Sequence, residues 1–437
     1  MRLRRLTWSG LDKAARQAAL QRPAVARNPE IESSVRRIIA TVRQDGDAAL
    51  LDFARELDRA TLTGLRVSED EARLAEASLP ADARAAIETA IGNVRRFHEA
   101  QVTAPLRVET APGVVCERIS KPLDAVGLYV PAGSAPLPST AIMLGVPSAI
   151  AGCPVRVLCT PPRPDGLADP AVVVAARACG IRDIFKAGGA QAIAAMAYGT
   201  ATIPKVAKVF GPGNAWVTAA KTVVAADPAG AALDMPAGPS EAMVIADQRA
   251  DARFVAMDLL SQAEHGPDSH VVLVSLDASL IDRVEGEIQD ALASLPRRAI
   301  IEQSLTHSVA VLVTDLAEAC AVANEYAPEH LIVQVADPRA FAGSINTAGS
   351  VFLGRWTPES VGDYCSGTNH VLPTYGYARA YSGLSVADFQ RRMTLQEVTL
   401  TGLRGLAPTV RTLAGLEGLD AHARAVTVRL DAADARP

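Results

Sequence analysis

The feature that most constrains the fold is an alternation of short apolar runs with alanine-rich helical runs, between about residues 125 and 353. The apolar runs are rich in Val, Ile and Leu, which is typical of buried strands. The runs between them are longer and end at glycines, as at Gly180 and Gly199. Strands that alternate with helices in this way predict a parallel sheet covered by helices on both faces.

The alternation falls into two successive series. The first predicts strands at 125–130, 155–159, 184–187 and 207–210, with helices at 170–179, 190–198 and 214–225. The second predicts strands at 242–246, 271–275, 309–314, 331–335 and 351–353, with helices at 252–265, 280–292 and 316–326. Two such series predict an α/β protein with two doubly wound, Rossmann-like domains and a ligand cleft between them.

The segments before and after these two series have a different sequence pattern. Apolar residues at helical intervals, such as Ile31, Val35, Ile38 and Val42, predict a helical N-terminal region. We expect this region, residues 1–120, to pack on the second α/β domain. The α/β domains are expected at 121–238 and 239–375. The remaining tail, 376–437, is expected to be helical over 391–413 and amphipathic over 421–430, and either covers the second domain or reaches a partner subunit.

Composition excludes several classes of protein. The chain has 437 residues with 43 Lys and Arg against 48 Asp and Glu, which argues against a nucleic-acid-binding protein. The most apolar window, 140–160, contains Pro147, Pro154 and Arg156, which argues against a membrane-spanning helix. The N-terminus lacks the apolar core of a signal peptide, and the six cysteines form no CxxC pair. We therefore expect a cytoplasmic enzyme with reduced cysteines.

Two glycine-rich turns follow predicted strands. Gly211–Asn214 reads GPGN between a strand and a helix, and Gly188-Gly189 occupies the same position one unit earlier. Glycines at such a point let backbone N–H groups approach an anion at a helix start. Either turn alone is typical of an ordinary βα connection, and no G-x-G-x-x-G motif is present. The two together favour a phosphate-bearing ligand.

Several polar side chains are candidates for chemistry. Gln262 and His265 share one face of a helix end, as two metal ligands would, although a capping histidine is the simpler alternative. Glu329 and His330 follow the helix-breaking Pro328 and suit proton transfer near neutral pH, although adjacent polar residues are common in loops. The polar loop 362–374 carries Asp363, Asn369 and His370 and is expected to be functional. Glu417 and His422 lie in the amphipathic tail, where packed or solvated residues are the commoner interpretation.

Taken together, these segments resemble the histidinol dehydrogenase family over nearly the whole chain. The resemblance is carried by VGLYVPAGSAPLPST, AGGAQAIAA, FGPGNAWVTAAK, DMPAGPSEAMVIAD, DLLSQAEHGPDS, NEYAPEHL, SVGDYCSGTNHVLPTYGYAR and EGLDAHARAV. The resemblance implies that the first α/β domain binds NAD and that the second carries a zinc ion and the catalytic residues. It also implies that the C-terminal tail is an arm exchanged in a homodimer, so that the active sites are shared between subunits.

The resemblance also implies roles for individual residues. The implied zinc ligands are Gln262, His265, Asp363 and, from the partner subunit, His422. The implied acid–base pair is Glu329 and His330. The implied substrate contacts are Ser240, His330, His370 and Glu417 together with the four zinc ligands, and the implied NAD contacts are Tyr129, Gln191 and Asn214.

The reaction implied by the resemblance is the last step of histidine biosynthesis. L-Histidinol is oxidised to L-histidinaldehyde and then to L-histidine, with one NAD reduced at each oxidation. One alternative is a related zinc and NAD enzyme that acts on another small alcohol, which the presence of His370 and Glu417 disfavours. A second alternative is a non-catalytic nucleotide-binding protein, which the intact Glu329 and His330 disfavour.

Overall fold

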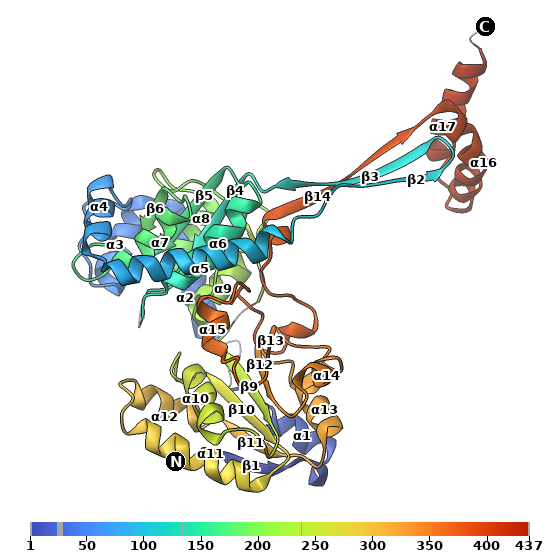
Figure 1. The fold of residues 1–437 in the computed structure, drawn as a ribbon. Helices are drawn as coiled ribbons and strands as arrows, with labels where there is room; N and C mark the ends of the chain where they lie inside the picture. The colour runs from blue at the N-terminus through green and yellow to red at the C-terminus, as the bar shows by residue number, and fades with distance from the viewer. Residues whose placement is uncertain (1, 24–28, 133–134, 237, 436–437) are drawn as a thin grey trace. The chain divides into compact units, whose positions relative to one another are not determined.

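The computed structural model describes residues 2–23, 29–132, 135–236 and 238–435 and divides into two compact units. The first unit comprises 1–101 and 123–389, and the second comprises 102–122 and 390–437. Two of the segments that carry the resemblance, 126–140 and 234–247, include residues outside the described ones, namely 133–134 and 237. The first unit contains two parallel sheets, each covered by helices (Figure 1).

The first sheet has the strand order β6-β5-β4-β7-β8, and all of its strands are parallel. Its strands are β4 (Ala125–Tyr129), β5 (Val155–Thr160), β6 (Asp183–Lys186), β7 (Lys208–Phe210) and β8 (Ala232–Leu233). Its helices are α6 (Pro138–Ile150), α7 (Pro170–Ala178), α8 (Gly189–Tyr198) and α9 (Ala215–Ala225). The chain builds outward from β4 through β5 to β6 and then returns to the other side of β4, so a topological switch point lies between β4 and β7.

The second sheet has the order β1-β11-β10-β9-β12-β13, also parallel. Its strands are β1 (Arg4–Thr7), β9 (Glu241–Ala246), β10 (His270–Ser275), β11 (Val309–Leu312), β12 (His330–Gln334) and β13 (Ser350–Leu353). Its helices are α10 (Ala252–Ala263), α11 (Ala278–Leu292), α12 (Arg298–Leu305), α13 (Leu316–Tyr326), α14 (Pro338–Ala342) and α15 (Glu359–Tyr364). Every residue of β9, β10 and β12 is buried, which explains their continuous apolar sequence. A second switch point lies between β9 and β12.

The N-terminal region is divided between the two sheets, which corrects one expectation. Strand β1 and helix α1 (Lys13–Ala19) belong to the second domain, where Trp8 and Leu20 join the core. The four helices that follow pack instead on the first domain, with α2 against α8 and α9, α4 against α7, and α5 against α6. The expected packing of 1–120 on the second domain is therefore wrong for these helices, because Val35 and Val42 are buried in the core around α8. Their bounds are α2 (Pro29–Asp45), α3 (Asp47–Leu57), α4 (Glu69–Ser78) and α5 (Ala81–Glu99).

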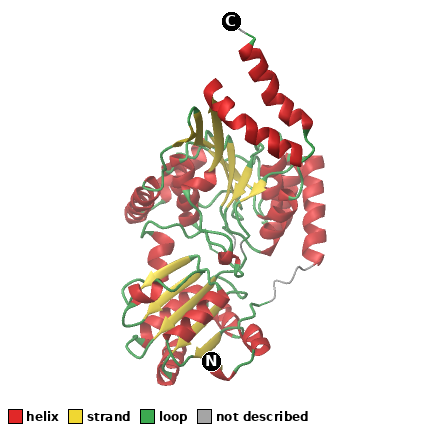
Figure 2. Ribbon diagram, turned by 90° about the vertical axis from the view of Figure 1, so that its right-hand side faces the viewer, coloured by secondary structure: helices red, strands yellow, loops and turns green. Residues whose placement is uncertain are grey.

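The second unit combines a hairpin, a C-terminal strand and two helices, which Figure 2 shows by secondary structure. Its antiparallel sheet has the order β14-β3-β2, built from β2 (Leu106–Ala111), β3 (Val114–Pro122) and β14 (Gln390–Val398). Its helices are α16 (Leu400–Leu416) and α17 (Asp420–Asp434).

Two expectations for the tail are corrected. A helix over 391–413 is wrong before residue 400, because the segment from Gln390 pairs along its whole length with β3. The unit begins at Gln390 and not at 376, because Phe389 is fully buried in the first unit and stacks on Phe210 at a ring distance of 4.1 Å. The helix that follows Thr399 is confirmed, and the expected amphipathic stretch 421–430 lies within a second helix, α17.

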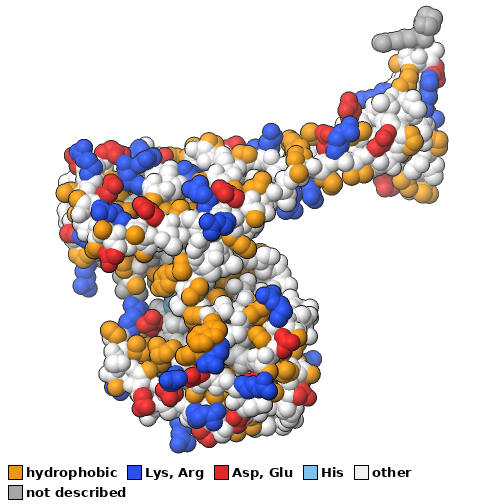
Figure 3. Space-filling view, viewed as in Figure 1, with side chains coloured by type: hydrophobic (Ala, Val, Ile, Leu, Met, Phe, Trp, Pro, Cys, Tyr) orange, Lys and Arg blue, Asp and Glu red, His pale blue; other side chains and the backbone are white. Residues whose placement is uncertain are grey.

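The distribution of surface charge and the state of the cysteines agree with what the composition predicts. Lys and Arg side chains are interspersed with Asp and Glu over the face shown in Figure 3. All six cysteines are free. Among the helices of the described residues, none is long and apolar enough to cross a membrane.

Candidate metal and catalytic site

The candidate site lies at the amino edge of the second sheet, at its switch point. Strands β9 and β12 pair in parallel and start at Glu241 and His330, so both first residues lie at this edge. Helix α10 follows β9 and returns to the same edge, where it ends at Ala263 between Gln262 and His265. The topology therefore brings a helix end and two strand starts together from segments far apart in the sequence.

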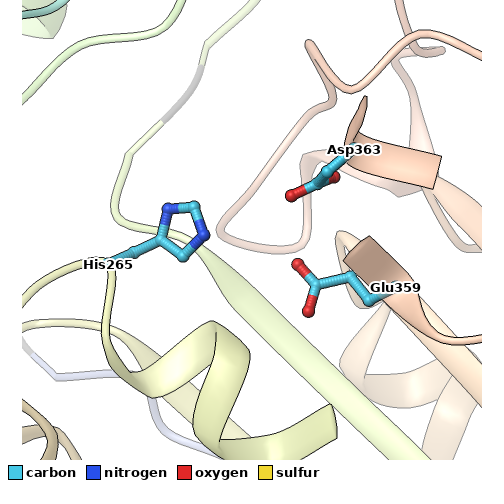
Figure 4. A group of neighbouring side chains, drawn as sticks. All are labelled: His265, Glu359 and Asp363. Carbon is cyan, nitrogen blue, oxygen red and sulfur yellow. The ribbon is translucent and has the colours of Figure 1, made fainter. Parts of the chain in front are cut away.

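Three of the side chains form a group with the geometry of a metal site. One nitrogen of His265 and one oxygen each of Glu359 and Asp363 all lie within 4.8 Å of one another. Glu359 and Asp363 are four residues apart on α15, so their carboxylates point in the same direction. Figure 4 shows both carboxylates facing His265 across a common space. Nitrogen and carboxylate oxygen are donors that Zn²⁺ accepts.

Gln262 provides an independent indication of a ligand. Its side chain is fully buried, and neither amide atom has a hydrogen-bond partner among the described residues. A buried amide without a partner costs about 1–3 kcal/mol, so such groups are normally satisfied. An amide oxygen held in this state, one helix turn before His265, fits a zinc ion bound by nitrogen and oxygen donors.

Glu241 holds the predicted acid–base pair through its backbone. Its N–H donates to Oε2 of Glu329 at 2.8 Å, and its carbonyl oxygen accepts from Nδ1 of His330 at 3.1 Å. A carbonyl oxygen only accepts, so Nδ1 carries the hydrogen and Nε2 is left to take up a proton. Nε2 lies 3.4 Å from Oδ1 of Asp363.

The pKa values of this pair and of the adjacent Asp363 are strongly shifted. Burial disfavours the imidazolium of His330, but the negative charges of Glu329, Asp363 and Glu359 outweigh burial and raise its pKa, so its neutral form is a stronger proton acceptor than a free imidazole. Burial raises the pKa of Glu329 to about 8, against the opposing charge of His330. For Asp363, burial acts upward but the adjacent His330 lowers the pKa to about 2. Shifts of this kind are typical of functional sites.

His370 is fixed on both sides of its ring. Its Nδ1 donates to the backbone oxygen of Asp363 at 2.9 Å, and its Nε2 lies 3.2 Å from the hydroxyl of Thr140 on α6. The preceding Asn369 donates to the Met143 carbonyl at 2.8 Å and so anchors this loop to α6. Ser240, the remaining expected substrate contact of this unit, immediately precedes β9 and is half-buried.

The expected NAD contacts lie at the carboxyl edge of the first sheet. Tyr129 ends β4, Gln191 lies in the first turn of α8, and Asn214 caps α9 by accepting from the backbone of its first turn. The Tyr129 hydroxyl accepts from the Gly189 N–H at 3.1 Å. Ligands of doubly wound sheets bind at this edge and at the switch point, which here lies between Tyr129 and the turn after β7.

The structure also shows what sequence reasoning missed. Glu359 was not a candidate, although its position four residues before Asp363 on one helix is a usable signal. Glu417 and His422 lie in the second unit, where both are exposed, directly after α16 and on α17. The group described in the first unit is therefore built without them.

Comparisons with known proteins bear on the family and the fold of this chain. A family model described as histidinol dehydrogenase matches residues 20–430. The histidinol dehydrogenase of Vibrio cholerae serotype O1 is 53% identical over 429 residues, covering 98% of this chain and 99% of the relative. That of Xanthomonas axonopodis pv. citri is 54% identical over 428 residues, covering 98% and 99%. The crystal structure of a histidinol dehydrogenase from Elizabethkingia anophelis superposes with a TM-score of 0.95 at 42% identity and covers 99% of each chain. The expected α/β fold is thereby confirmed.

Proposed function

This chain belongs to the histidinol dehydrogenase family and oxidises L-histidinol in the last step of histidine biosynthesis, and we propose that it does so with zinc and NAD at the site described above. The observation that carries this proposal is the meeting of His265, Asp363 and His330 at one sheet edge. A metal group and a proton-transfer pair are thus close enough to act on one small substrate.

We propose that Gln262, His265 and Asp363 of one subunit hold the zinc, with His422 of the partner subunit as the fourth ligand. The unpartnered buried amide of Gln262 and the convergence of His265 and Asp363 support this assignment. When bound, zinc orients a substrate that offers an imidazole and an amine, since both are nitrogen donors it favours. Ser240, His370 and Glu417 are the proposed further contacts to L-histidinol.

We propose that NAD binds at the carboxyl edge of the first sheet and contacts Tyr129, Gln191 and Asn214. When bound, NAD accepts the hydride at each oxidation. The position of the turn Gly211–Asn214 at the start of α9 supports this placement, because ligands of doubly wound sheets bind at the carboxyl edge beside the switch point.

The protons are handled by the side chains of the second domain. His330 accepts the hydroxyl proton of L-histidinol through Nε2 while the hydride leaves the same carbon, giving the aldehyde. Glu329 then takes a proton from the water that adds to the aldehyde, and His330 returns its proton to the former carbonyl oxygen, forming the hydrate. His330 accepts a hydroxyl proton of the hydrate while the second hydride leaves, giving the carboxylic acid. The hydrogen bond from His330 Nδ1 to Glu241 supports this role, because it leaves Nε2 free for the proton.

The substrate is tested by NADH formation with a panel of small alcohols. We expect turnover with L-histidinol to exceed turnover with every other alcohol tested. A clear preference for another alcohol would show a related zinc and NAD enzyme of different specificity, and no NADH with any alcohol would show a non-catalytic nucleotide-binding protein.

We also propose that the chain is a cytoplasmic homodimer in which the second unit, with Glu417 and His422, completes the site of the partner. Mixed dimers of His422→Ala and Asp363→Ala chains test this arrangement. Each variant alone lacks a proposed ligand in every site, whereas one site of a mixed dimer has the full set. Partial recovery of activity is expected in verified mixed dimers, and no recovery would show that His422 serves its own chain.

A further inference from the structure

An ion pair between a partly buried guanidinium and a buried carboxylate adjoins the acid–base pair and includes a residue from the N-terminal segment. Arg22, which follows α1, donates from Nε and Nη2 to the carboxylate of Glu241, the latter at 2.9 Å. Its Nη2 also donates to the carbonyl of Tyr326 at 2.9 Å, and its guanidinium stacks over the Tyr326 ring at 3.9 Å. The Glu241 side chain is 2% exposed and also accepts from the Tyr375 N–H at 2.8 Å.

Glu241, whose side chain binds Arg22, also makes backbone hydrogen bonds to both proton-transfer residues. The Glu241 N–H positions the carboxylate of Glu329, and the Glu241 carbonyl positions the imidazole of His330. The side chain of Glu241 is therefore anchored on one side while its peptide groups orient the reacting residues on the other. A shift of this first residue of β9 moves Glu329 and His330 together.

We propose that Arg22 is a positioning residue for the reaction, acting through Glu241 on Glu329 and His330. The inference rests on the proposed role of those two residues in proton transfer. Loss of the guanidinium leaves a buried carboxylate without its cation, and the carboxylate then moves or takes up a proton. A misplacement of about 1 Å at a reacting group can cost on the order of 10²-fold in rate.

The test compares Arg22→Gln and Arg22→Lys with the unchanged enzyme, with kcat normalised to folded protein by far-UV circular dichroism. We expect Arg22→Gln to lower kcat by roughly 10- to 100-fold with an unchanged KM for NAD, and Arg22→Lys to recover part of the loss. The matched control is Arg5→Gln, because Arg5 lies on the same N-terminal segment and pairs with Asp282 and Glu285, away from Glu241. The control is expected to keep the wild-type kcat.

A double-mutant cycle with Glu241→Gln tests the proposed route. Because both residues act through one contact, the double variant should be no slower than the slower single variant, and multiplied losses would contradict the route. A folded Arg22→Gln enzyme with wild-type kcat overturns the inference. If Arg22→Gln does not fold, the same criterion is applied to Arg22→Lys. A folded Arg22→Lys enzyme with wild-type kcat then overturns the inference. If Glu329→Gln and His330→Asn also keep full activity in this assay, the proposed proton-transfer roles themselves fail.

Discussion

At the scale of single residues, the hydrogen bonds of Glu241 distinguish the proposed tasks of two neighbouring side chains. Nδ1 of His330 is committed to a carbonyl, so Nε2 is the atom available to the substrate hydroxyl. Among the described residues, the hydrogen bond that holds Glu329 reaches its Oε2, which leaves Oε1 for a water molecule. Water is needed only after the aldehyde has formed, so the proposal requires Glu329 for the second oxidation alone and His330 for both.

This division of labour predicts different defects for two variants. Glu329→Gln keeps the size of the side chain but removes the base, so it should oxidise L-histidinol to the aldehyde level and be about 10²–10⁴-fold slower with supplied L-histidinaldehyde. His330→Asn should impair both oxidations. The measurement is NADH formation with each substrate under single-turnover conditions. Equal slowing of both steps by Glu329→Gln would make Glu329 an orienting partner of His330 and not the base for water.

The buried Asp258 is expected to make the stability of the protein depend on pH. Burial raises the pKa of Asp258 on α10 to about 7, against a hydrogen bond from Gln334. The unfolded chain releases this proton near pH 4, so the free energy of unfolding falls as pH rises from about 4 to 7. Asp258→Asn removes this loss and should be more stable than the wild type at pH 8, by on the order of 4 kcal/mol. Urea unfolding at pH 5 and pH 8 checks this, and an equal difference at both pH values would refute it.

Residue types and spacing predicted part of this site. Spacing made Gln262 and His265 candidates, and adjacency made Glu329 and His330 candidates, but only the family resemblance gave these residues roles. Arg22 was not recognisable, because its partner Glu241 lies far along the chain and only the sheet brings them together. His98 illustrates the same limit: it lies among charged residues in the sequence but is fully buried.

At the scale of elements, the turn after β7 is fixed by a buried ion pair. The N–H of Gly211 donates to Oδ2 of Asp234 at 2.8 Å, and its carbonyl accepts from Nζ of Lys221 at 2.9 Å. Lys221 and Asp234 are themselves paired and buried. Gly211 has a φ of 118°, and a side chain there would collide with the Tyr129 carbonyl. The turn proposed to bind NAD is therefore rigid before the cofactor arrives.

Asp234→Asn should consequently weaken NAD binding. The variant leaves the Lys221 charge without its partner and loosens Gly211, so we expect the Kd for NAD to rise about 10-fold with an unchanged KM for L-histidinol. Calorimetric titration with NAD measures this. The matched control is Glu71→Gln, which breaks the buried pair of Lys186 and Glu71 in the same domain. A similar loss of NAD affinity in the control would mean that general destabilisation, and not the turn, is responsible.

The elements differ in how well their sequences identify them. The central strands of both parallel sheets were predictable because they are buried and therefore continuously apolar. The edge strands β1 and β8 were not predicted, and their residues are exposed or only partly buried. Strand β14 was not, because nearly all of its residues are exposed and its pairing with β3 leaves little pattern of burial in the sequence. The packing of α2 to α5 was not predictable either, because an amphipathic helix shows that it has a buried face but not which domain covers it.

At the scale of the whole molecule, the cores of the two α/β domains are large and apolar and include no proposed zinc ligand. The three proposed ligands of the first unit, Gln262, His265 and Asp363, lie at a sheet edge and not inside a small metal-stapled domain. Folding should therefore not depend on the metal.

Removal of zinc by a chelator should accordingly abolish activity and preserve the fold. We expect an unchanged far-UV circular dichroism spectrum and recovery of activity when zinc is added back. Loss of the helical signal on chelation would show that the metal is a structural element.

The central claim is that one site of this protein carries out both oxidations of L-histidinol with zinc and NAD. The most direct measurement is the yield of NADH and of L-histidine from a limiting amount of L-histidinol added to the zinc-loaded enzyme with excess NAD. The account predicts two molecules of NADH and one of L-histidine for each L-histidinol, with no accumulation of aldehyde. One NADH for each L-histidinol, with L-histidinaldehyde as the end product, would contradict it.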